Sequence, residues 1–519
     1  MKRIFSLRRI LSPTKQASYQ GTRWYHEVSY KQYGKDPKEV LSYRSDSLID
    51  DLDFPSFLAG ENEEEFVRVE MRHVPWNPAD VNTVQGRYPS PYESSSASQA
   101  ITPNSRLVRN KIRVATDRCI GRYFENDPVI GSEGWGRVTH STSSSPSALS
   151  PGTLVTLGLP GLGTLRSSLW LPASAVLPVP EFVWEQLGPA GCSLFQLGGT
   201  ALRLLSDFVD LKPGDVVLQN AGGSGVGFLA SQLAASSSLL GNPRKNIEND
   251  NIDDQSPVMV SLIRRRGKSK ESFEKTVEYL RSVGKNAFVV AEEDFFLPED
   301  EKTNKSRSHR ANGSTINKEA IREMRERLRE ISPSGSLPKL ALNAVGGNSA
   351  RLMLKLLEPN AGSTMVTYGG MSGKGVQLGT PQLIFSDVQA VGYWHSRWMV
   401  RQYEQEQAER KQHARGQISG VDRYKSDPRK KFSNHRIEMV NLLSRLVQEE
   451  DLKCPPAHTF RLENLQEGLL WQANQSHNQS SDSPYQSQIR GKLVWDCSEY
   501  KTEYIDERAK SDGIGFRMK

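Results

Sequence analysis

The sequence predicts an α/β protein in which a domain with a doubly wound parallel sheet is embedded within another domain. Two observations predict this fold. Between residues 216 and 368, apolar runs of strand length alternate with longer segments of helical periodicity, which is the pattern of right-handed β-α-β units. A glycine-rich loop also joins the first of these strands to the helix that follows it. With 519 residues, the chain exceeds one domain of roughly 150 residues and has room for insertions.

Apolar periodicity and turn residues predict the elements in chain order. An alternating strand is expected at 66–73, ending in a turn at 75–78, and helical periodicity spans 185–208. The glycine loop opens a helix after the first strand of the parallel sheet. The other elements of that domain are strands at 216–219, 258–263, 287–290, 340–343 and 364–368 and helices at 271–283 and 349–357.

Polar stretches of low complexity interrupt these elements. They contain too few apolar side chains to form a core of their own, so we predict polar surface insertions. The stretches are residues 94–98, 141–147, 241–256, 298–317, 402–431 and 474–488.

The basic character of the chain is concentrated at its N-terminus. The net charge is +7, but a group of Lys and Arg residues precedes the first acid, Glu27, and without it the chain is nearly neutral. Nucleic-acid binding is therefore not indicated. An Arg-rich, acid-free leader with apolar residues at helical spacing is typical of a mitochondrial transit peptide, expected over 1–25 with a processing site near Arg23. An ordinary basic tail is the alternative.

Cysteine spacing and hydropathy exclude further classes. The four cysteines, Cys119, Cys192, Cys454 and Cys497, form no C-x-x-C pair, so neither a structural zinc site nor a disulfide framework is indicated. No apolar run approaches the ~20 residues that a membrane span needs, so no membrane span is expected.

Gly223, Gly225 and Gly227 lie between a predicted strand and a predicted helix. Glycines in this place let the backbone turn sharply and approach a pyrophosphate, which the N–H groups of the helix N-terminus then bind. The context favours a Rossmann-type dinucleotide loop over a plain surface turn.

The end of the next strand predicts which dinucleotide binds. An NAD enzyme places Asp or Glu there, whereas this chain has Arg264, Arg265 and Arg266. Guanidinium groups suit a 2′-phosphate by charge and by bidentate geometry, so NADPH is expected. A solvated basic run is the alternative for one or two of the three.

Tyr88 is a candidate proton donor. A phenol is protonated at neutral pH and can hydrogen-bond an oxyanion or donate a proton to a carbanion. Chemistry alone favours the simpler interpretation, a tyrosine that packs in its loop.

Several separated motifs resemble a known family. The run Asn-Pro-Ala-Asp-Val-Asn at 77–82, followed by Gln-Gly-Arg-Tyr-Pro at 85–89, resembles the N-P-S-D-x-N…Q-G-x-Y signature of the mitochondrial trans-2-enoyl thioester (enoyl-ACP/enoyl-CoA) reductases. These belong to the zinc-free medium-chain dehydrogenase/reductase superfamily. Further resemblances, in the same order, lie at 161–164, 219–227, 342–347, 364–371 and 392–398.

The resemblance implies a fold and a set of site residues. A GroES-like, β-rich catalytic domain, formed from both ends of the chain, would enclose a Rossmann domain. Tyr88 would donate the proton or stabilise an enolate, and Trp394 would help to shape the site. The residues implied to bind NADPH are Gly223, Ser224, Gly225, Val226, Arg264, Arg265, Arg266, Tyr368, Gly369, Gly370, Met371, Tyr393, Trp394, His395, Ser396 and Lys492.

The chain departs from related patterns in three places. Zinc-dependent relatives have a metal-binding histidine where this chain has Ser132, between Gly131 and Glu133, so no metal is expected. Leu197 stands where the family has an asparagine, which removes one expected polar contact to the cofactor. An insertion after Pro91, reaching to about residue 124, separates Tyr88 from Glu133.

Together these features predict an NADPH-dependent oxidoreductase that saturates enoyl thioesters in mitochondrial fatty-acid synthesis. NADPH would supply a hydride to C3 while Tyr88 supplies a proton to C2. Acyl carrier protein or CoA would carry the substrate, a homodimer is implied by the family, and the mitochondrial matrix is the expected location. An NADPH-quinone oxidoreductase of the same fold and a non-catalytic binding protein derived from it remain alternatives.

The expected domain boundaries follow the same resemblance. They are 26–199 for the first part of the catalytic domain, 200–398 for the NADPH-binding domain, 399–500 for the return to the catalytic domain with insertions, and 501–519 for a tail.

Overall fold

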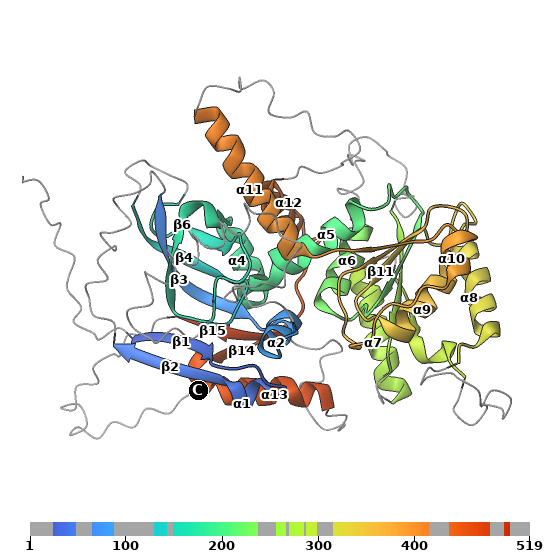
Figure 1. Ribbon diagram of the computed structural model, residues 1–519, viewed down its shortest axis with the longest axis horizontal. Coiled ribbons are helices and arrows are strands. Elements are labelled where there is room, and N and C mark those ends of the chain that lie inside the picture. Colours follow the sequence, from blue (N-terminus) through green and yellow to red (C-terminus); the bar gives the residue numbers. More distant parts are fainter. Residues whose placement is uncertain are drawn as a thin grey trace, which may run out of the picture.

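The structure, a computed structural model, contains two large sheets and a separate two-stranded hairpin. Figure 1 shows the two sheets in separate lobes, with helices between them. The described residues are 24–47, 65–87, 129–142, 149–236, 256–265, 269–284, 287–297, 315–414, 435–477 and 492–498.

One lobe is built on a six-stranded, entirely parallel sheet. Its strand order is β10 (Ala287–Ala291), β9 (Val258–Ile263), β8 (Val216–Asn220), β11 (Leu340–Asn343), β12 (Thr364–Thr367) and β13 (Gln389–Gly392). The chain order reverses between β8 and β11, as in the doubly wound Rossmann sheet, whose ligands bind beyond the carboxyl ends of the strands at this point. The five strands expected from apolar runs are confirmed, whereas the short edge strand β13 was not predicted.

Helices cover both faces of this sheet (Figure 1). The predicted helices correspond to α6 (Gly225–Ala235), α7 (Lys270–Gly284) and α9 (Gly347–Leu356). The sequence analysis missed α8 (Lys318–Ile331) and the short α10 (Thr380–Ile384). In α8 only Ile321, Met324 and Leu328 are buried, so one narrow apolar stripe among charged residues holds the helix against the sheet.

The other lobe is a mostly antiparallel sheet to which both chain ends contribute. Strands β14 (Ala457–Arg461) and β15 (Lys492–Asp496) continue the sheet beside β3 (Phe66–Pro75). The remaining strands are β4 (Trp135–Ser141), β5 (Leu154–Leu157), β6 (Ser168–Pro172) and β7 (Val176–Pro178). The predicted fold class, a β-rich domain from both chain ends plus a Rossmann-type sheet, is confirmed, while its numerical boundaries remain a prediction.

A hairpin packs against this second lobe. It consists of β1 (Trp24–Tyr30) and β2 (Leu41–Ser47), with α1 (Pro37–Val40) between them and α13 (Leu465–His477) beside α1. Tyr25 is buried and Glu27 forms a β-bridge with Arg166. Short 3-10 helices lie at η1 (Ala173–Ala175), η6 (Glu292–Phe295) and η8 (Leu462–Asn464).

Two predictions about local structure were wrong. Strand β3 ends at Pro75, as the sequence indicated, but residues 76–78 form no turn, because Pro78 opens α2 (Pro78–Val84), where the missing N–H of proline costs no helical hydrogen bond. Residues 185–208 are not one helix but α4 (Glu181–Leu187), a 3-10 segment η2 (Gly188–Ser193), a π-helical turn η3 (Leu194–Gly198) and α5 (Gly199–Ser206). Gly188 ends α4 with a φ of 52° and Pro189 follows it, which interrupts the helical path.

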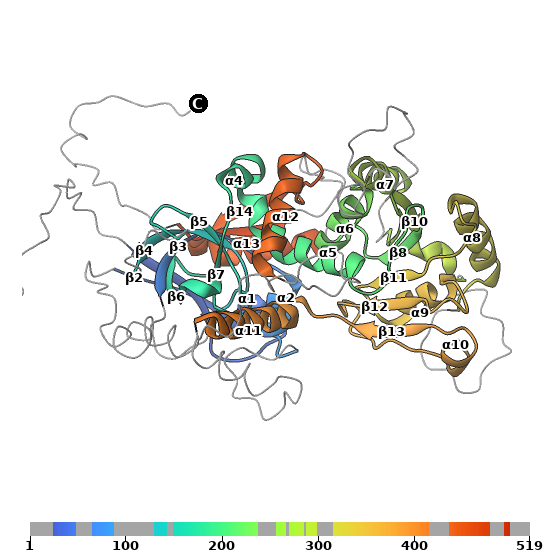
Figure 2. The same ribbon diagram turned by 90° about the horizontal axis from the view of Figure 1, so that it is seen from above.

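The stretch 402–431, expected to be a polar insertion, is helical over its first part. The helix α11 (His395–Ala414) continues past Tyr403, which is buried, and contacts α12 (Arg436–Gln448). Figure 2 shows these two helices beside the lobe of the mostly antiparallel sheet, called the catalytic lobe here after the domain expected from the sequence. Similarly, α13 extends four residues into the stretch predicted from residue 474.

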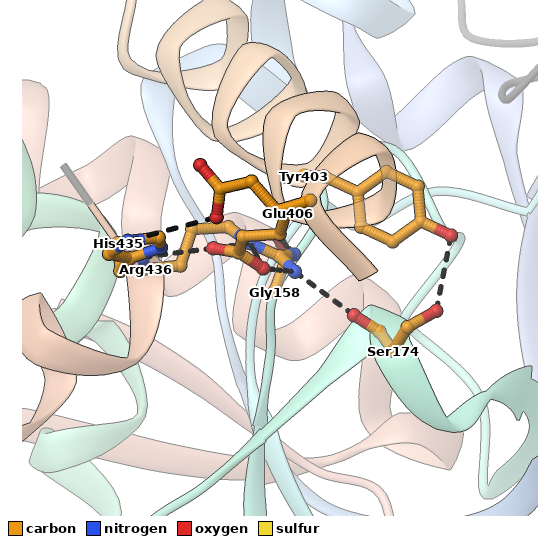
Figure 3. A network of polar contacts seen from close by, with 7 residues as sticks. Gly158, Ser174, Tyr403, Glu406, His435 and Arg436 are labelled. Atoms are coloured by element: carbon orange, nitrogen blue, oxygen red, sulfur yellow. Dashed lines mark hydrogen bonds and ion pairs between the residues drawn. The ribbon is translucent and has the colours of Figure 1, made fainter. Parts of the chain in front are cut away.

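A buried arginine explains why this part of α11 is ordered (Figure 3). The Arg436 guanidinium is 1% exposed and pairs with Glu406 at 2.6 Å. It also donates to the carbonyls of Gly158 at 2.8 Å and Ser174 at 3.1 Å, and lies 4.9 Å from the centre of the Tyr403 ring. Arg436, at the start of α12, thus connects α11 and α12 to the catalytic lobe, with its charge paired and its N–H donors hydrogen-bonded.

The two lobes share a buried core. One apolar cluster contains Trp135 and Val494 from the catalytic sheet together with Val217 and Leu342 from the Rossmann sheet. Helix residues such as Phe228 join the same cluster. Within the described ranges, none of the helices has the length and apolar character that crossing a bilayer would require.

Candidate active site

Four segments singled out in the sequence leave neighbouring strands of the Rossmann sheet. The glycine loop follows β8, Arg264 and Arg265 follow β9, the segment 368–371 follows β12, and the segment 393–396 follows β13. Because these strands are parallel members of one sheet, in which only β11 lies between β8 and β12, their carboxyl ends lie at one edge, where open α/β sheets bind their ligands. The structure therefore gathers the described cofactor candidates at this edge, except Lys492.

The glycine loop is closely packed at Gly227 and has free space around Gly223. A Cβ on Gly227 would lie 2.7 Å from the Ala221 carbonyl oxygen, whereas a Cβ on Gly223 would have nothing within 4 Å. Ser224 caps α6, its hydroxyl accepting the Gly227 N–H at 3.2 Å. The first turn of α6 thus presents backbone N–H groups beside an open glycine, an arrangement that fits a pyrophosphate.

Buried amides hold the strand ends together around this loop. Asn220 donates to Asn343 Oδ1 at 2.8 Å and accepts the Ala344 N–H at 2.7 Å. Asn343 accepts the Gly346 N–H at 3.0 Å and donates to Thr367 at 3.1 Å. These buried hydrogen bonds therefore join the carboxyl ends of β8, β11 and β12 beside the glycine loop.

The arginines after β9 have different surroundings. Arg265 forms a bidentate pair with Asp294, at 2.6 and 3.0 Å, and its backbone N–H donates to Glu293. The Asp294 carboxylate raises the pKa of the Arg265 guanidinium. Arg264 is exposed, and no described residue binds its side chain. Arg266 lies outside the described residues, so Arg264 is the described candidate best placed to meet a 2′-phosphate.

The segment after β12 folds back over β11. The Met371 N–H donates to the Ala344 carbonyl at 3.0 Å, and a Cβ on Gly369 would lie 2.9 Å from the same oxygen. Gly370 has open space around it and Met371 is 47% exposed. Burial raises the pKa of Tyr368, so its phenol stays protonated next to the glycine loop.

In the segment after β13, Trp394 is partly exposed and His395 is buried. Trp394 is 37% exposed, whereas His395 is 3% exposed and its ring is stacked on Trp398. The Tyr393 hydroxyl lies 2.8 Å from His395 Nδ1. Burial lowers the pKa of His395 to about 3, so the imidazole is neutral and packs. Any contact of His395 with a cofactor would come from its backbone, and Ser396 is half-buried beside it.

Lys492 lies in a buried polar network on the catalytic side. Its Nζ donates to the Asn77 side-chain oxygen, and the Asn77 amide nitrogen donates to Glu133. Asp80 accepts the Asn77 backbone N–H at 2.9 Å. Burial raises the pKa of Asp80 to about 6 and that of Glu133 well above its usual range, and burial lowers the pKa of Lys492. Lys492 is therefore bound to protein groups in this structure.

Of the other residues singled out in the sequence, the structure describes Leu197 but not Tyr88. Tyr88 and the insertion after Pro91 lie outside the described residues, which end at Arg87 and resume at Val129. Leu197 lies over the glycine loop, because a Cβ on Gly225 would be 2.6 Å from Leu197 Cδ1. An apolar side chain, Leu197, thus contacts the glycine loop at the position where the family pattern has a polar asparagine.

The hydrogen bonds that join Asn77 to Glu133 and to Lys492 were not predicted from the sequence. Each was noted separately, but their meeting depends on β15 pairing with β3, which no local pattern indicates. Among the described residues, no cluster of His, Cys, Asp or Glu has the arrangement of a metal site. Cys192 and Cys497 are buried free thiols and Cys454 is a free, half-buried one.

Known proteins resemble this chain in sequence and in fold. No family model matches. The mitochondrial enoyl-acyl-carrier-protein reductase of Rattus norvegicus is 31% identical over 336 residues, which are 64% of this chain and 65% of the relative. The protein of the same name from Xenopus tropicalis is 30% identical over 370 residues, 71% of this chain and 77% of the relative. The match thus spans slightly less than two thirds of the rat protein.

A solved structure supports the same assignment at the level of the fold. The complex of Etr1p with NADP and crotonyl-CoA superposes with a TM-score of 0.59 at 21% identity, covering 91% of this chain and 99% of that chain. On the sequence identity and coverage, the chain belongs to the family of mitochondrial enoyl-acyl-carrier-protein reductases.

Proposed function

We propose that this protein is an NADPH-dependent reductase that saturates the trans-2 double bond of acyl thioesters. One observation supports it above all: an open glycine loop and an exposed arginine at adjacent strand ends lie in a chain that also has the Asn77 and Tyr88 motif. The relatives named for this reaction in rat and frog support the same assignment.

The cofactor is expected to lie along the carboxyl edge of the Rossmann sheet. The first turn of α6, with Gly223, Ser224, Gly225 and Val226, would bind the pyrophosphate, and Arg264 would bind the 2′-phosphate. Tyr368, Gly369, Gly370 and Met371, with the segment from Tyr393 to Ser396, would line the nicotinamide half. NADPH, when bound, supplies the hydride for C3 of the substrate.

The protein's own groups then stabilise charge and transfer a proton. Tyr88 is proposed to hydrogen-bond the thioester oxygen as negative charge develops there and to deliver a proton to C2. Trp394, which is partly exposed beside the cofactor edge, is proposed to shape the acyl site. We assign polarisation of the thioester carbonyl to these hydrogen bonds.

The carrier of the acyl group is proposed to be acyl carrier protein or CoA. A protein similar in fold has been solved with crotonyl-CoA, and the named relatives act on the acyl-carrier-protein thioester. A role in mitochondrial fatty-acid synthesis, in the matrix, is proposed on the same grounds and on the basic, acid-free leader.

A homodimer is proposed from the exposed edge of the Rossmann sheet. Strand β13 pairs only with β12 among the described strands, so its other edge offers unpaired backbone groups. Next to it, Leu383, Ile384 and Phe385 are 50%, 64% and 72% exposed. A second copy placed edge to edge would satisfy the strand and cover these side chains.

The experiment that tests the function compares acceptors at equal NADPH concentration. We expect purified protein without residues 1–23 to oxidise NADPH rapidly with crotonyl-CoA and slowly with a benzoquinone. The reverse preference would favour the quinone oxidoreductase alternative. NADPH binding without turnover of either acceptor would favour a non-catalytic protein.

A further inference from the structure

The buried network around Glu133 has no role in the proposed reaction as described so far. Glu133 is 4% exposed, Asn77 is 6% exposed and Asp80 is 1% exposed. Burying a carboxyl group is costly unless hydrogen bonds compensate it. A chain that places two carboxyl groups and a lysine around one asparagine therefore maintains an arrangement that apolar packing alone would not require.

Glu133 is the point at which this network meets three segments. Its side chain accepts from the Asn77 amide and from the backbone of Gln196, and its main-chain carbonyl accepts from Thr164 at 2.7 Å. Thr164 belongs to the tight turn that pairs with Gly131. Glu133 thus bonds to α2, to the π-helical turn and to the 161–164 loop at once.

The π-helical turn connects Glu133 with the cofactor loop. Gln196 is followed by Leu197, whose Cδ1 atom lies against Gly225. Gly199, at the start of α5, packs against the His395 ring, and His395 follows Trp394. Insertions of a π turn into helices are frequent at functional sites. Glu133 therefore holds, through Gln196, the segment that contacts two parts of the proposed cofactor site.

On its other side, the network leads toward Tyr88. Asn77 caps α2, and the chain beyond α2 stays bonded to that helix, because Gly86 donates to the Thr83 carbonyl at 3.0 Å and Arg87 to the Asn82 carbonyl at 2.8 Å. Tyr88 is the next residue. The position and direction of the chain entering Tyr88 thus follow from the position of α2, which Asn77 anchors.

We propose that Glu133 is a positioning residue of the reductase: through Asn77 and Gln196 it sets the distance between the segment leading to Tyr88 and the glycine loop. The inference rests on the proposed function, in which Tyr88 acts on a substrate held beside the cofactor. A displacement of about 1 Å between reacting groups can cost about 10²-fold in rate. Glu133 is well placed to prevent such a displacement without touching substrate.

Hydrogen bonding rather than charge performs this role. Burial raises the pKa of Glu133 and thereby favours the neutral acid, which still accepts from Asn77 through its carbonyl oxygen. A glutamine has the same shape and keeps one acceptor oxygen. An alanine removes it and leaves the Asn77 and Gln196 donors unsatisfied, which is costly in a buried site.

The test compares Glu133→Gln, Glu133→Ala and a matched control, Glu27→Gln. Glu27 is also a buried carboxyl group of the catalytic lobe, 2% exposed, but it lies on β1 outside the network. For each protein we would measure kcat with crotonyl-CoA, the NADPH dissociation constant, thermal stability and amide hydrogen exchange over 78–87.

We expect Glu133→Ala to lower kcat about 10²-fold with little change in NADPH affinity and with faster exchange over 78–87. Glu133→Gln should restore most of kcat and of the protection, while Glu27→Gln changes stability alone. Wild-type kcat in a folded Glu133→Ala protein, or an equal loss of kcat in both alanine and glutamine variants, would overturn the proposal.

The two proposals fail in distinguishable ways. If the wild-type protein does not reduce crotonyl-CoA, the proposed function fails, and hydrogen exchange still reports on Glu133. Unchanged protection of 78–87 in Glu133→Ala would then overturn the positioning role by itself.

Discussion

At the scale of single residues, Tyr88 is the group on which the proposed chemistry depends most. Replacing it by phenylalanine removes one hydroxyl and keeps the ring. If that hydroxyl stabilises charge formed after hydride arrives, kcat should fall by about 10² to 10³, as for loss of an oxyanion donor. NADPH affinity should remain near that of the wild type, which a fluorescence titration would measure. Wild-type kcat in a folded Tyr88→Phe protein would transfer the role to water or another residue.

The arginines after β9 make a matched pair for testing cofactor choice. Arg264 is exposed with no described side-chain partner, whereas Arg265 is engaged by Asp294. We predict that Arg264→Ala raises KM for NADPH far more than KM for NADH, because a charge-assisted contact is worth about 1.5 to 3 kcal/mol. Arg265→Ala should have the smaller effect. Equal effects of Arg264→Ala on the two cofactors would contradict recognition of the 2′-phosphate at this position.

The buried carboxyl groups predict how stability depends on pH. Burial raises the pKa of Glu133 from 4.5 to about 8 and that of Asp80 from 3.8 to about 6. Within these windows the folded protein keeps protons that the unfolded chain has released, so unfolding becomes easier as the pH rises. Lys492, whose pKa burial lowers from 10.5, has the opposite effect between its lowered pKa and that value.

We therefore predict that the melting temperature of the wild type decreases as the pH rises from 4.5 to about 8, the range over which Glu133 keeps its proton only in the folded protein. Glu133→Gln, which has no proton to release there, should show a shallower fall. Thermal unfolding monitored by circular dichroism would measure both slopes. A wild-type slope no steeper than that of Glu133→Gln would contradict the raised pKa.

At the scale of elements, two glycines of the glycine loop are expected to have different roles, Gly227 in packing and Gly223 in cofactor binding. Gly223 has open space where a Cβ would lie, whereas a Cβ on Gly227 would lie 2.7 Å from the Ala221 carbonyl. We predict that Gly223→Ala keeps the melting temperature and weakens NADPH binding, because the added methyl group lies where a pyrophosphate would approach. Gly227→Ala should lower the melting temperature. Full NADPH affinity in Gly223→Ala would argue against this loop as the pyrophosphate site.

The elements also show what the sequence could and could not predict. The parallel strands β8, β9, β11 and β12 were found because a strand buried on both faces reads as a continuous apolar run. The helix α11 was not predicted, and 402–431 was expected to be a polar insertion, because the contact that holds α11 is made by Arg436, which lies distant in sequence and binds Glu406. The break at Gly188 and the π turn at 194–198 were missed, because the apolar spacing alone reads as a continuous helix.

The candidate site was predictable to different degrees in its two halves. The cofactor residues follow strands in a fixed pattern, so Gly223, Arg264 and Tyr368 could be placed at one edge from the sequence. The network of Glu133, Asn77 and Lys492 could not, because it forms only when the C-terminal strand β15 pairs with β3.

At the scale of the whole molecule, the position of β1 bears on import. We predict that the leader directs a fused fluorescent protein into mitochondria, because its basic, acid-free composition is typical of transit peptides. Cleavage should occur before Trp24, since β1 begins there and Tyr25 is buried. Fluorescence microscopy and N-terminal sequencing of the imported protein would check both points. A fusion of residues 1–40 that stays in the cytosol would contradict the prediction.

The central claim is that this chain transfers hydride from NADPH to C3 of an enoyl thioester while a proton reaches C2. The most direct test is to reduce crotonyl-CoA with NADPH carrying deuterium at the transferred C4 position and to analyse the product by mass spectrometry and NMR. The account predicts butyryl-CoA with one deuterium, located at C3, and a second deuterium at C2 only when the reaction is run in heavy water. Unlabelled product, label at C2 from the cofactor, or no acyl product would contradict it.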